Sequence, residues 1–291
     1  MSARHVAELL LLSLLWGSAY LFTRAAVPAF GPVPLIALRF AIASCLLLPV
    51  LAARGGLPLL REHRWRFLVL GSFFTAIPFL LIAFAAQSLG AGLLAILNAT
   101  APLFGAVVGR LWLGERIGPM RASGLVVGFA GVVVLLWGSA AAAPGALLAI
   151  ALMLLTSASW GFAANYTRAR LGRIDPIAIT TGNMLVAALA IGPFAVPAWP
   201  TELPAARAWV EMLILGVLCS GGGMLLYFRL LRAIGTVPTM SVTFLSPVVA
   251  VVSGALYLGE PITTQTVLGG TIVLAGIALV LRLVPVPGRR R

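Results

Sequence analysis

Lysine is absent from this sequence and aspartate occurs once, so charged residues make up only 9% of its 291 positions. All 20 basic residues are arginines, and they outnumber the 7 acidic residues to give a formal net charge of +13. Hydrophobic residues supply 61% of the chain. This scarcity of charge excludes an ordinary soluble domain of this length and indicates a membrane protein with several spans.

Cysteine and histidine are also scarce, with two of each. Cys45 and Cys219 lie inside apolar runs, which predicts small buried side chains rather than a disulfide or a metal site. His5 lies at the edge of a run and His63 in a connection, and no His, Cys and carboxylate cluster has the spacing of metal ligands. Since no catalytic group lies inside the runs, the sequence predicts no enzymatic activity, no bound metal and no cofactor.

Long apolar runs recur along the whole chain. A helix needs about 20 apolar residues to cross a bilayer, and ten runs come close to that length. The predicted spans are residues 6–26, 32–53, 65–86, 91–113, 120–138, 145–167, 176–196, 208–232, 238–258 and 264–283. Short connections rich in glycine and proline join them. The predicted fold class is therefore an all-α integral membrane protein with ten transmembrane helices.

The arginines are distributed unevenly between alternate connections. With the N-terminus in the cytoplasm, all but three of the 20 arginines fall on the inner side. Arg24 and Arg207 fall on the outer side, and Arg39 lies within a span. Because basic residues accumulate in cytoplasmic connections, both termini are predicted to be cytoplasmic, in a multi-pass protein of a bacterial inner membrane. This placement favours topology signals over a nucleic-acid-binding face.

One segment of the chain occurs twice. Residues 98–115 recur as residues 243–260, with Pro102 and Pro247 separated by 145 positions, as are Glu115 and Glu260. A repeat near half the chain length indicates two copies of one unit, predicted as residues 1–140 and 141–291. Because each copy holds five spans, an odd number, the second copy enters the membrane from the opposite side. The sequence therefore predicts an inverted repeat.

Helix-weakening residues fall at corresponding points of the two copies. Pro102 and Pro247 each lie within an apolar span and free a backbone carbonyl, that of Asn98 in the first copy. Pro78 in the third span corresponds to Gly223 in the eighth. Weakened helices at matching points of two repeats indicate the substrate site of a transporter. The predicted gating positions are therefore Pro78, Pro102, Gly223 and Pro247.

Aromatic and polar residues cluster around these weak points. A small-molecule site is expected to be mostly apolar with a few fixed polar groups. The predicted substrate-binding residues are Trp16, Tyr20, Phe79, Asn98, Trp160, Asn165, Tyr227 and Phe244. Taken singly, each is more commonly a packing residue or part of an interface belt; as a set that meets four weakened helices, they predict a cavity.

Arg39 is the one charged residue inside a span. Arginine there is costly and often functional, and a guanidinium binds a carboxylate through two parallel hydrogen bonds. We therefore predict a contact with a substrate carboxylate. The alternatives are that Arg39 extends its charge toward the membrane surface or holds backbone carbonyls of a neighbouring helix.

Two further patterns bear on mechanism and packing. No carboxylate lies near the middle of a span, whereas proton-coupled carriers usually keep a titratable group there. Facilitated transport or exchange is therefore favoured, with a glutamate at a span end or the substrate itself as the alternative proton carrier. The glycine pairs Gly105/Gly109 and Gly124/Gly128 predict close helix packing, with a dimer face as the alternative.

The order of these motifs resembles a known family. The elements Leu14-Leu15-Trp16-Gly17, Leu38-Arg39-Phe40 and Pro102…Leu113-Gly114-Glu115, with its second copy, resemble the EamA-type drug/metabolite transporters across essentially the whole chain. Within that family they are most similar to the YddG-like exporters of aromatic amino acids. The resemblance implies a central cavity bounded by spans one, three, four, six, eight and nine, with alternating access.

The resulting hypothesis is an inner-membrane transporter that exports small neutral metabolites, most of all amino acids including aromatic ones. A carrier of sugars, nucleotide sugars or drugs is the first alternative, because a fold does not fix a substrate. A membrane scaffold or flippase without an aqueous site is the second. The expected partners are a small-molecule substrate and the lipid bilayer, with no nucleic acid, in a monomer or homodimer.

Overall fold

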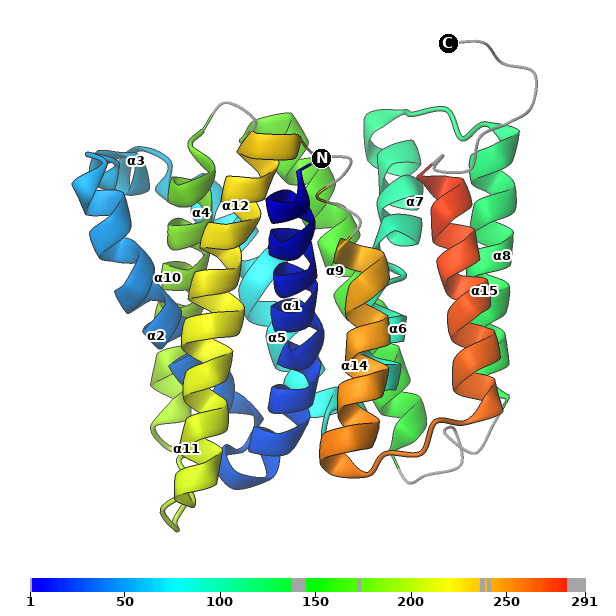
Figure 1. The fold of residues 1–291 in the computed structure, drawn as a ribbon. Helices are drawn as coiled ribbons and strands as arrows, with labels where there is room; N and C mark the ends of the chain where they lie inside the picture. Colours follow the sequence, from blue (N-terminus) through cyan, green and yellow to red (C-terminus); the bar gives the residue numbers. More distant parts are fainter. Residues whose placement is uncertain (1, 138–144, 172–173, 236–238, 240–241, 282–291) are drawn as a thin grey trace.

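The structure, a computed structural model, describes residues 2–137, 145–171, 174–235, 239 and 242–281 (Figure 1). Within these residues the regular secondary structure is entirely helical, and the helices run side by side in alternating directions. We call the end at which α1 (Ala3–Phe30) begins the N-terminal end of the bundle, and the other the opposite end. Some of the arginines that are predicted to lie on the cytoplasmic side fall outside the described residues, namely Arg173, Arg282 and Arg289–Arg291.

Seven helical stretches in the described residues are long and apolar enough to cross a membrane. Four are single helices: α1, α2 (Pro32–Ala53), α9 (Ala146–Arg170) and α10 (Pro176–Ala195). Three are composite: α4 (Arg64–Leu70) with η1 (Gly71–Ala76) and α5 (Ile77–Ala85); α6 (Ala91–Asn98) with α7 (Ala101–Leu113); and α11 (Ala206–Leu213) with η3 (Ile214–Gly222) and α12 (Gly223–Ile234).

Shorter apolar helices complete the set: α8 (Pro119–Leu136), α14 (Val242–Leu258) and α15 (Thr264–Val280). The short helix α3 (Leu57–Glu62) follows α2. The predicted all-α fold with ten membrane helices is confirmed.

Proline and glycine set many helix boundaries, as local stereochemistry requires. Pro32 and Pro176 stand in the first turns of α2 and α10, where the missing N–H costs nothing. Asp175 caps the start of α10, where its side chain accepts a hydrogen bond from the Ile177 N–H at 2.7 Å. Gly114, with φ of 68°, ends α7 in the left-handed conformation that glycine adopts without strain.

Helix contacts come in related pairs. α1 packs against α14, while α9 packs against α7; η1 packs against α10, while η3 packs against α2. Within each pair, the helices of one contact lie about half the chain length away in sequence from the corresponding helices of the other contact. The most extensive contact joins α8 to α15.

Glycines allow α8 and α15 to approach closely. A Cβ on Gly124 would lie 2.8 Å from the Gly276 carbonyl oxygen, and a Cβ on Gly276 would overlap the backbone of Gly128. The predicted role of Gly124 in close helix packing is thus an interaction between helices of the same chain.

Gly276→Ala is expected to destabilise the protein by roughly 1–3 kcal/mol, because the added methyl group must push α15 away from the α8 backbone. Gly192→Ala in α10 is the matched control, since nothing lies within 4 Å of its added Cβ and alanine favours a helix. Thermal unfolding in detergent measures both. Equal melting temperatures for the two variants would contradict the close-packing account.

Candidate functional site

The third and eighth spans both loosen at corresponding positions. η1 and η3 are π-helical segments, and each is followed directly by an α-helix, α5 or α12. Pro78 lies in the first turn of α5, and Gly223 begins α12. π-Helical turns are rare and frequently mark functional sites. The predicted weak points are therefore places where the helix geometry changes.

α9 supplies hydrogen bonds to the weakened third span. Pro78 has no N–H, so the carbonyl of Phe74 loses its usual helical partner. The indole Nε1–H of Trp160 donates to this carbonyl oxygen at 2.7 Å, and the Ser159 hydroxyl donates to that of Phe73 at 2.6 Å. The predicted site residue Trp160 thus has a structural role that accounts for its indole N–H.

The fourth span is interrupted where the sequence predicts. α6 ends at Asn98, and α7 begins one residue before Pro102. The Ser157 hydroxyl of α9 donates to the Leu97 carbonyl at 3.0 Å, with the Asn98 carbonyl at 3.5 Å. In the ninth span, Pro247 lies inside α14, which is continuous from Val242. The two copies therefore differ here within the described residues.

Arg39 is deeply buried and has an uncharged environment. Its side chain comes from α2, and the residue is 5% exposed. Nε donates to the Ser220 hydroxyl in η3 at 2.8 Å, and Cζ lies 4.5 Å from the ring centroid of Phe79. No carboxylate among the described residues forms an ion pair with it. A buried charge without a counter-charge is costly, so this guanidinium is suited to an anionic group of a ligand.

Polar groups with unused hydrogen-bonding capacity lie near Arg39 and on α14. The Tyr20 hydroxyl on α1 lies near enough to interact with the Asn98 side chain and with the charge of Arg39. Asn98 Oδ1 is buried and accepts no hydrogen bond from the described residues; the same holds for Ser246 Oγ in α14. Buried polar atoms normally have partners, so these atoms are positioned to meet a bound molecule or water.

An aromatic wall adjoins this polar group. The Phe79 ring packs against Trp160 at 5.6 Å between centroids and edge-on against Phe40 at 5.1 Å. We call Tyr20, Arg39, Phe79, Asn98 and Trp160 the central group. It combines one cation, one acceptor without a donor among the described residues, and two aromatic rings packed edge to face.

A second pair of predicted residues lies between α1 and α12. Trp16 and Tyr227 have ring centroids 5.3 Å apart. A Cβ on Gly223 would lie 2.8 Å from Trp16 Nε1, so glycine makes room for the indole. Phe244 packs against the main apolar core rather than this pair.

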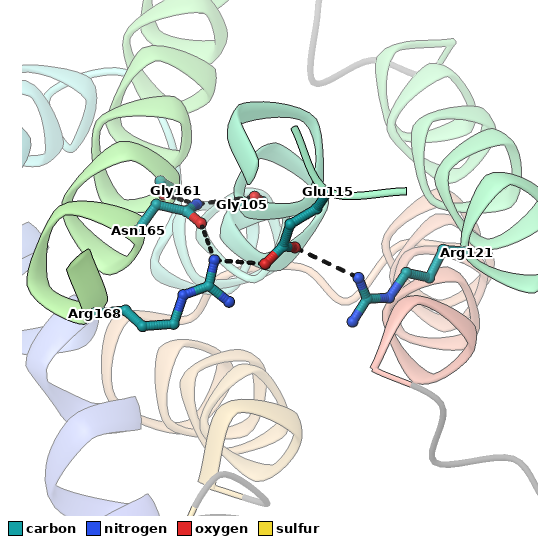
Figure 2. Close-up of polar contacts among 6 residues, drawn as sticks. All are labelled: Gly105, Glu115, Arg121, Gly161, Asn165 and Arg168. Atoms are coloured by element: carbon teal, nitrogen blue, oxygen red, sulfur yellow. Dashed lines mark hydrogen bonds and ion pairs between the residues drawn. The ribbon is translucent and has the colours of Figure 1, made fainter. Parts of the chain in front are cut away.

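Asn165 belongs to a charged cluster at the N-terminal end of the bundle (Figure 2). Its amide Nδ2 donates to the Gly105 and Gly161 carbonyls at 2.9 and 2.8 Å. Its Oδ1 accepts from Arg168, which also donates to Glu115 at 2.6 Å. Since these bonds use both ends of the amide, Asn165 joins α7 to α9, and its role as a substrate contact stays a prediction.

The opposite end of the bundle contains the counterpart of this cluster. Both carboxylate oxygens of Glu260 accept from the Ala91 N–H at the start of α6, at 3.1 and 2.9 Å. Arg24 donates to the carbonyls of Ala86 and Gln87 at 2.7 and 3.2 Å. Both side chains therefore hold the connection between α5 and α6. We call these contacts the opposite-end clasp.

Sequence reasoning missed Ser220 and the contacts of Glu115. Ser220 is a polar residue beside the glycine run of an apolar span, and that position was the available signal. Glu115 lies between Arg168 and Arg121, the latter at 3.7 Å (Figure 2). Nothing local in the sequence relates a residue that follows α7 to residues of α8 and α9.

Comparison with known proteins agrees with this architecture. The profile of the EamA-like transporter family matches residues 6–137 and 147–282. An uncharacterized transporter of Archaeoglobus fulgidus is 25% identical over 275 residues, covering 92% of this chain and 95% of the relative. The uncharacterized inner membrane transporter YedA of Escherichia coli is 29% identical over 276 residues, covering 92% of this chain and 88% of the relative.

A solved protein structure also has the same fold. It matches with a TM-score of 0.67 and 20% sequence identity, covering 97% of this chain and 98% of that chain. At this identity the likeness concerns the fold alone.

Proposed function

Because this chain belongs to the EamA-like transporter family, we propose that it exports small neutral metabolites, in particular amino acids including aromatic ones. The observation that carries the proposal is the central group, in which Arg39 is buried without a carboxylate partner among the described residues and Asn98 Oδ1 is buried without a hydrogen-bond donor among them. A zwitterionic amino acid supplies both missing partners. Similarity to the YddG-like exporters is part of this proposal.

The chemistry of an amino acid matches the central group atom by atom. Arg39 would bind the α-carboxylate through its terminal nitrogens while its Nε remains on Ser220. Asn98 Oδ1 would accept a hydrogen bond from the α-ammonium group. The rings of Phe79 and Trp160 would contact an aromatic or apolar side chain.

The orientation follows from charge. The distribution of arginines supports an orientation in which the N-terminal end of the bundle and both termini face the cytoplasm, in a bacterial inner membrane. We place the boundary between the two inverted repeats at residues 140 and 141. Movement would occur at Pro78, Pro102, Gly223 and Pro247, which alternately open the central group to each side.

Counterflow in proteoliposomes tests the proposed substrate. Vesicles loaded with unlabelled phenylalanine receive labelled phenylalanine outside, without an imposed proton gradient. We expect transient accumulation of label that other neutral amino acids suppress and sugars or nucleotide sugars do not. Absence of accumulation by folded protein, or suppression by sugars alone, would remove amino acids from the proposal.

The Pro102→Ala/Pro247→Ala variant is expected to slow counterflow severalfold, because each alanine restores a backbone N–H and stiffens its helix. Its binding of phenylalanine should change little, since neither proline belongs to the central group. Pro193→Ala in α10, a proline outside the proposed moving spans, is the control. Unchanged exchange rates in the double variant would count against these hinges.

A further inference from the structure

A basic pocket lies at the N-terminal end of the bundle, away from the central group. Its volume is about 450 Å³, and it is formed where α2 ends, α10 begins and α12 ends. Its lining includes the side chains of Arg54, Arg229 and Arg232, together with Ile177, Leu225 and Phe228.

The pocket has more positive charge than its neighbours neutralise. Arg229 Nη2 lies 2.9 Å from Glu8 Oε1, and Glu8 also pairs with Arg4 at 3.1 Å. Arg54 and Arg232 form no ion pair with any described residue. Asp175, the acidic residue nearest in sequence to the pocket residue Ile177, caps the start of α10. Two arginines therefore remain available to an external anion.

The apolar part of the pocket lies deeper than the charges along α12. Leu225, Phe228, Arg229 and Arg232 occupy one face of the helix by their spacing, and both arginines are nearer the helix end. This arrangement places guanidinium groups at the membrane surface and apolar side chains below them. A phospholipid has the complementary arrangement, an anionic phosphate above an acyl chain.

Simpler explanations cover only part of this geometry. Basic residues in the last turn of a helix interact favourably with its dipole, which accounts for Arg232 on α12. It does not account for Arg54, which reaches the same pocket from the end of α2. A free phosphate ion would use the arginines but would leave the apolar lining without a partner.

We propose that this pocket binds the phosphate headgroup of an anionic phospholipid, with an acyl chain along Leu225 and Phe228. Arg54 and Arg232 provide the charge that selects an anionic lipid over a zwitterionic one. The site is independent of the transported substrate.

Native mass spectrometry of the full chain in detergent tests this site with dioleoyl phosphatidylglycerol and dioleoyl phosphatidylcholine as probes. The wild-type protein should retain phosphatidylglycerol preferentially. Arg54→Gln/Arg232→Gln should weaken its apparent affinity roughly 25-fold, and Arg232→Gln alone roughly fivefold. All three arginines of the pocket are at least partly exposed, so these substitutions should leave the fold intact, which the melting temperature checks.

Arg61→Gln/Arg66→Gln is the matched control, because it removes the same charge from exposed positions at the same end of the bundle but outside the pocket. It should retain phosphatidylglycerol within about twofold of wild type. An equal loss in both double variants would overturn the proposal in favour of general surface charge. Displacement of the lipid by soluble glycerol phosphate at equal concentration would overturn it in favour of a free-phosphate site.

Discussion

Replacing Arg39 with methionine is expected to lower phenylalanine counterflow roughly 100-fold while leaving the melting temperature unchanged or higher. The transport loss follows because the proposed carboxylate contact is a charge-assisted pair in a buried site. The stability gain follows because Arg39 is 5% exposed and has no counter-charge among the described residues. Removing such a charge relieves a desolvation cost.

The local hydrogen bonds support a loss of transport without a loss of stability. Ser220, the residue that accepts from Arg39 Nε, also donates to the Leu215 carbonyl at 2.9 Å, so its hydroxyl keeps a partner after the substitution. Arg39→Lys should retain the charge but lose the forked geometry, and should therefore transport at an intermediate rate. A transport loss that tracks a lower melting temperature in Arg39→Met would indicate a purely structural arginine.

Glu260→Gln is expected to increase access to the centre of the bundle from the opposite end about tenfold, because it removes a carboxylate that holds the start of α6. The clasp is tightly enclosed: a Cβ on Gly90 would lie 2.7 Å from Glu260 Oε2, and one on Gly254 would lie 2.6 Å from it. Weakening it should favour the conformation open at that end.

Thiol labelling measures this access. Ser246→Cys provides a reporter at a buried position with no hydrogen-bond partner among the described residues, in a background with Cys45→Ala and Cys219→Ala. A membrane-impermeant reagent is applied from the side of the opposite-end clasp. Labelling should accelerate in Glu260→Gln.

Glu115→Gln is the matched variant at the N-terminal end. It weakens the contacts with Arg168 and Arg121 (Figure 2), so it should leave labelling from the opposite side unchanged or slower. Equal acceleration by both glutamine variants would indicate general loosening rather than separate effects of the opposite-end clasp and the charged cluster at the N-terminal end.

Several features of the site were predictable from local rules. Pro102 and Pro78 identify interruptions in the fourth and third spans because proline lacks the N–H that an α-helix needs. The structure has a helix boundary at the first and a π-helical segment before the second. Asp175 was predictable as a cap because its partner, the Ile177 N–H, is only two residues away.

Other roles depended on helix packing. Trp160 was predicted as a cavity residue because it belongs to the aromatic and polar set around the weakened helices, but its N–H donates to a carbonyl 86 residues away. Asn165 was predicted for the same reason, and its amide joins Gly105 to Gly161. A residue's spacing along a helix gives the direction of its side chain but does not identify the neighbouring helix.

The sequence by itself determined the membrane class, the ten spans, the positions where helices weaken and the burial of a charge in the second span. These properties depend on hydrophobicity over about 20 residues and on backbone chemistry within one helical turn. Only the tertiary structure decided that Arg39 meets Ser220, 181 residues away, and that Glu260 holds the start of α6, 169 residues away. Such contacts depend on which helices pack together, and in a chain of similar apolar helices that choice follows from the fit of many small residues at once.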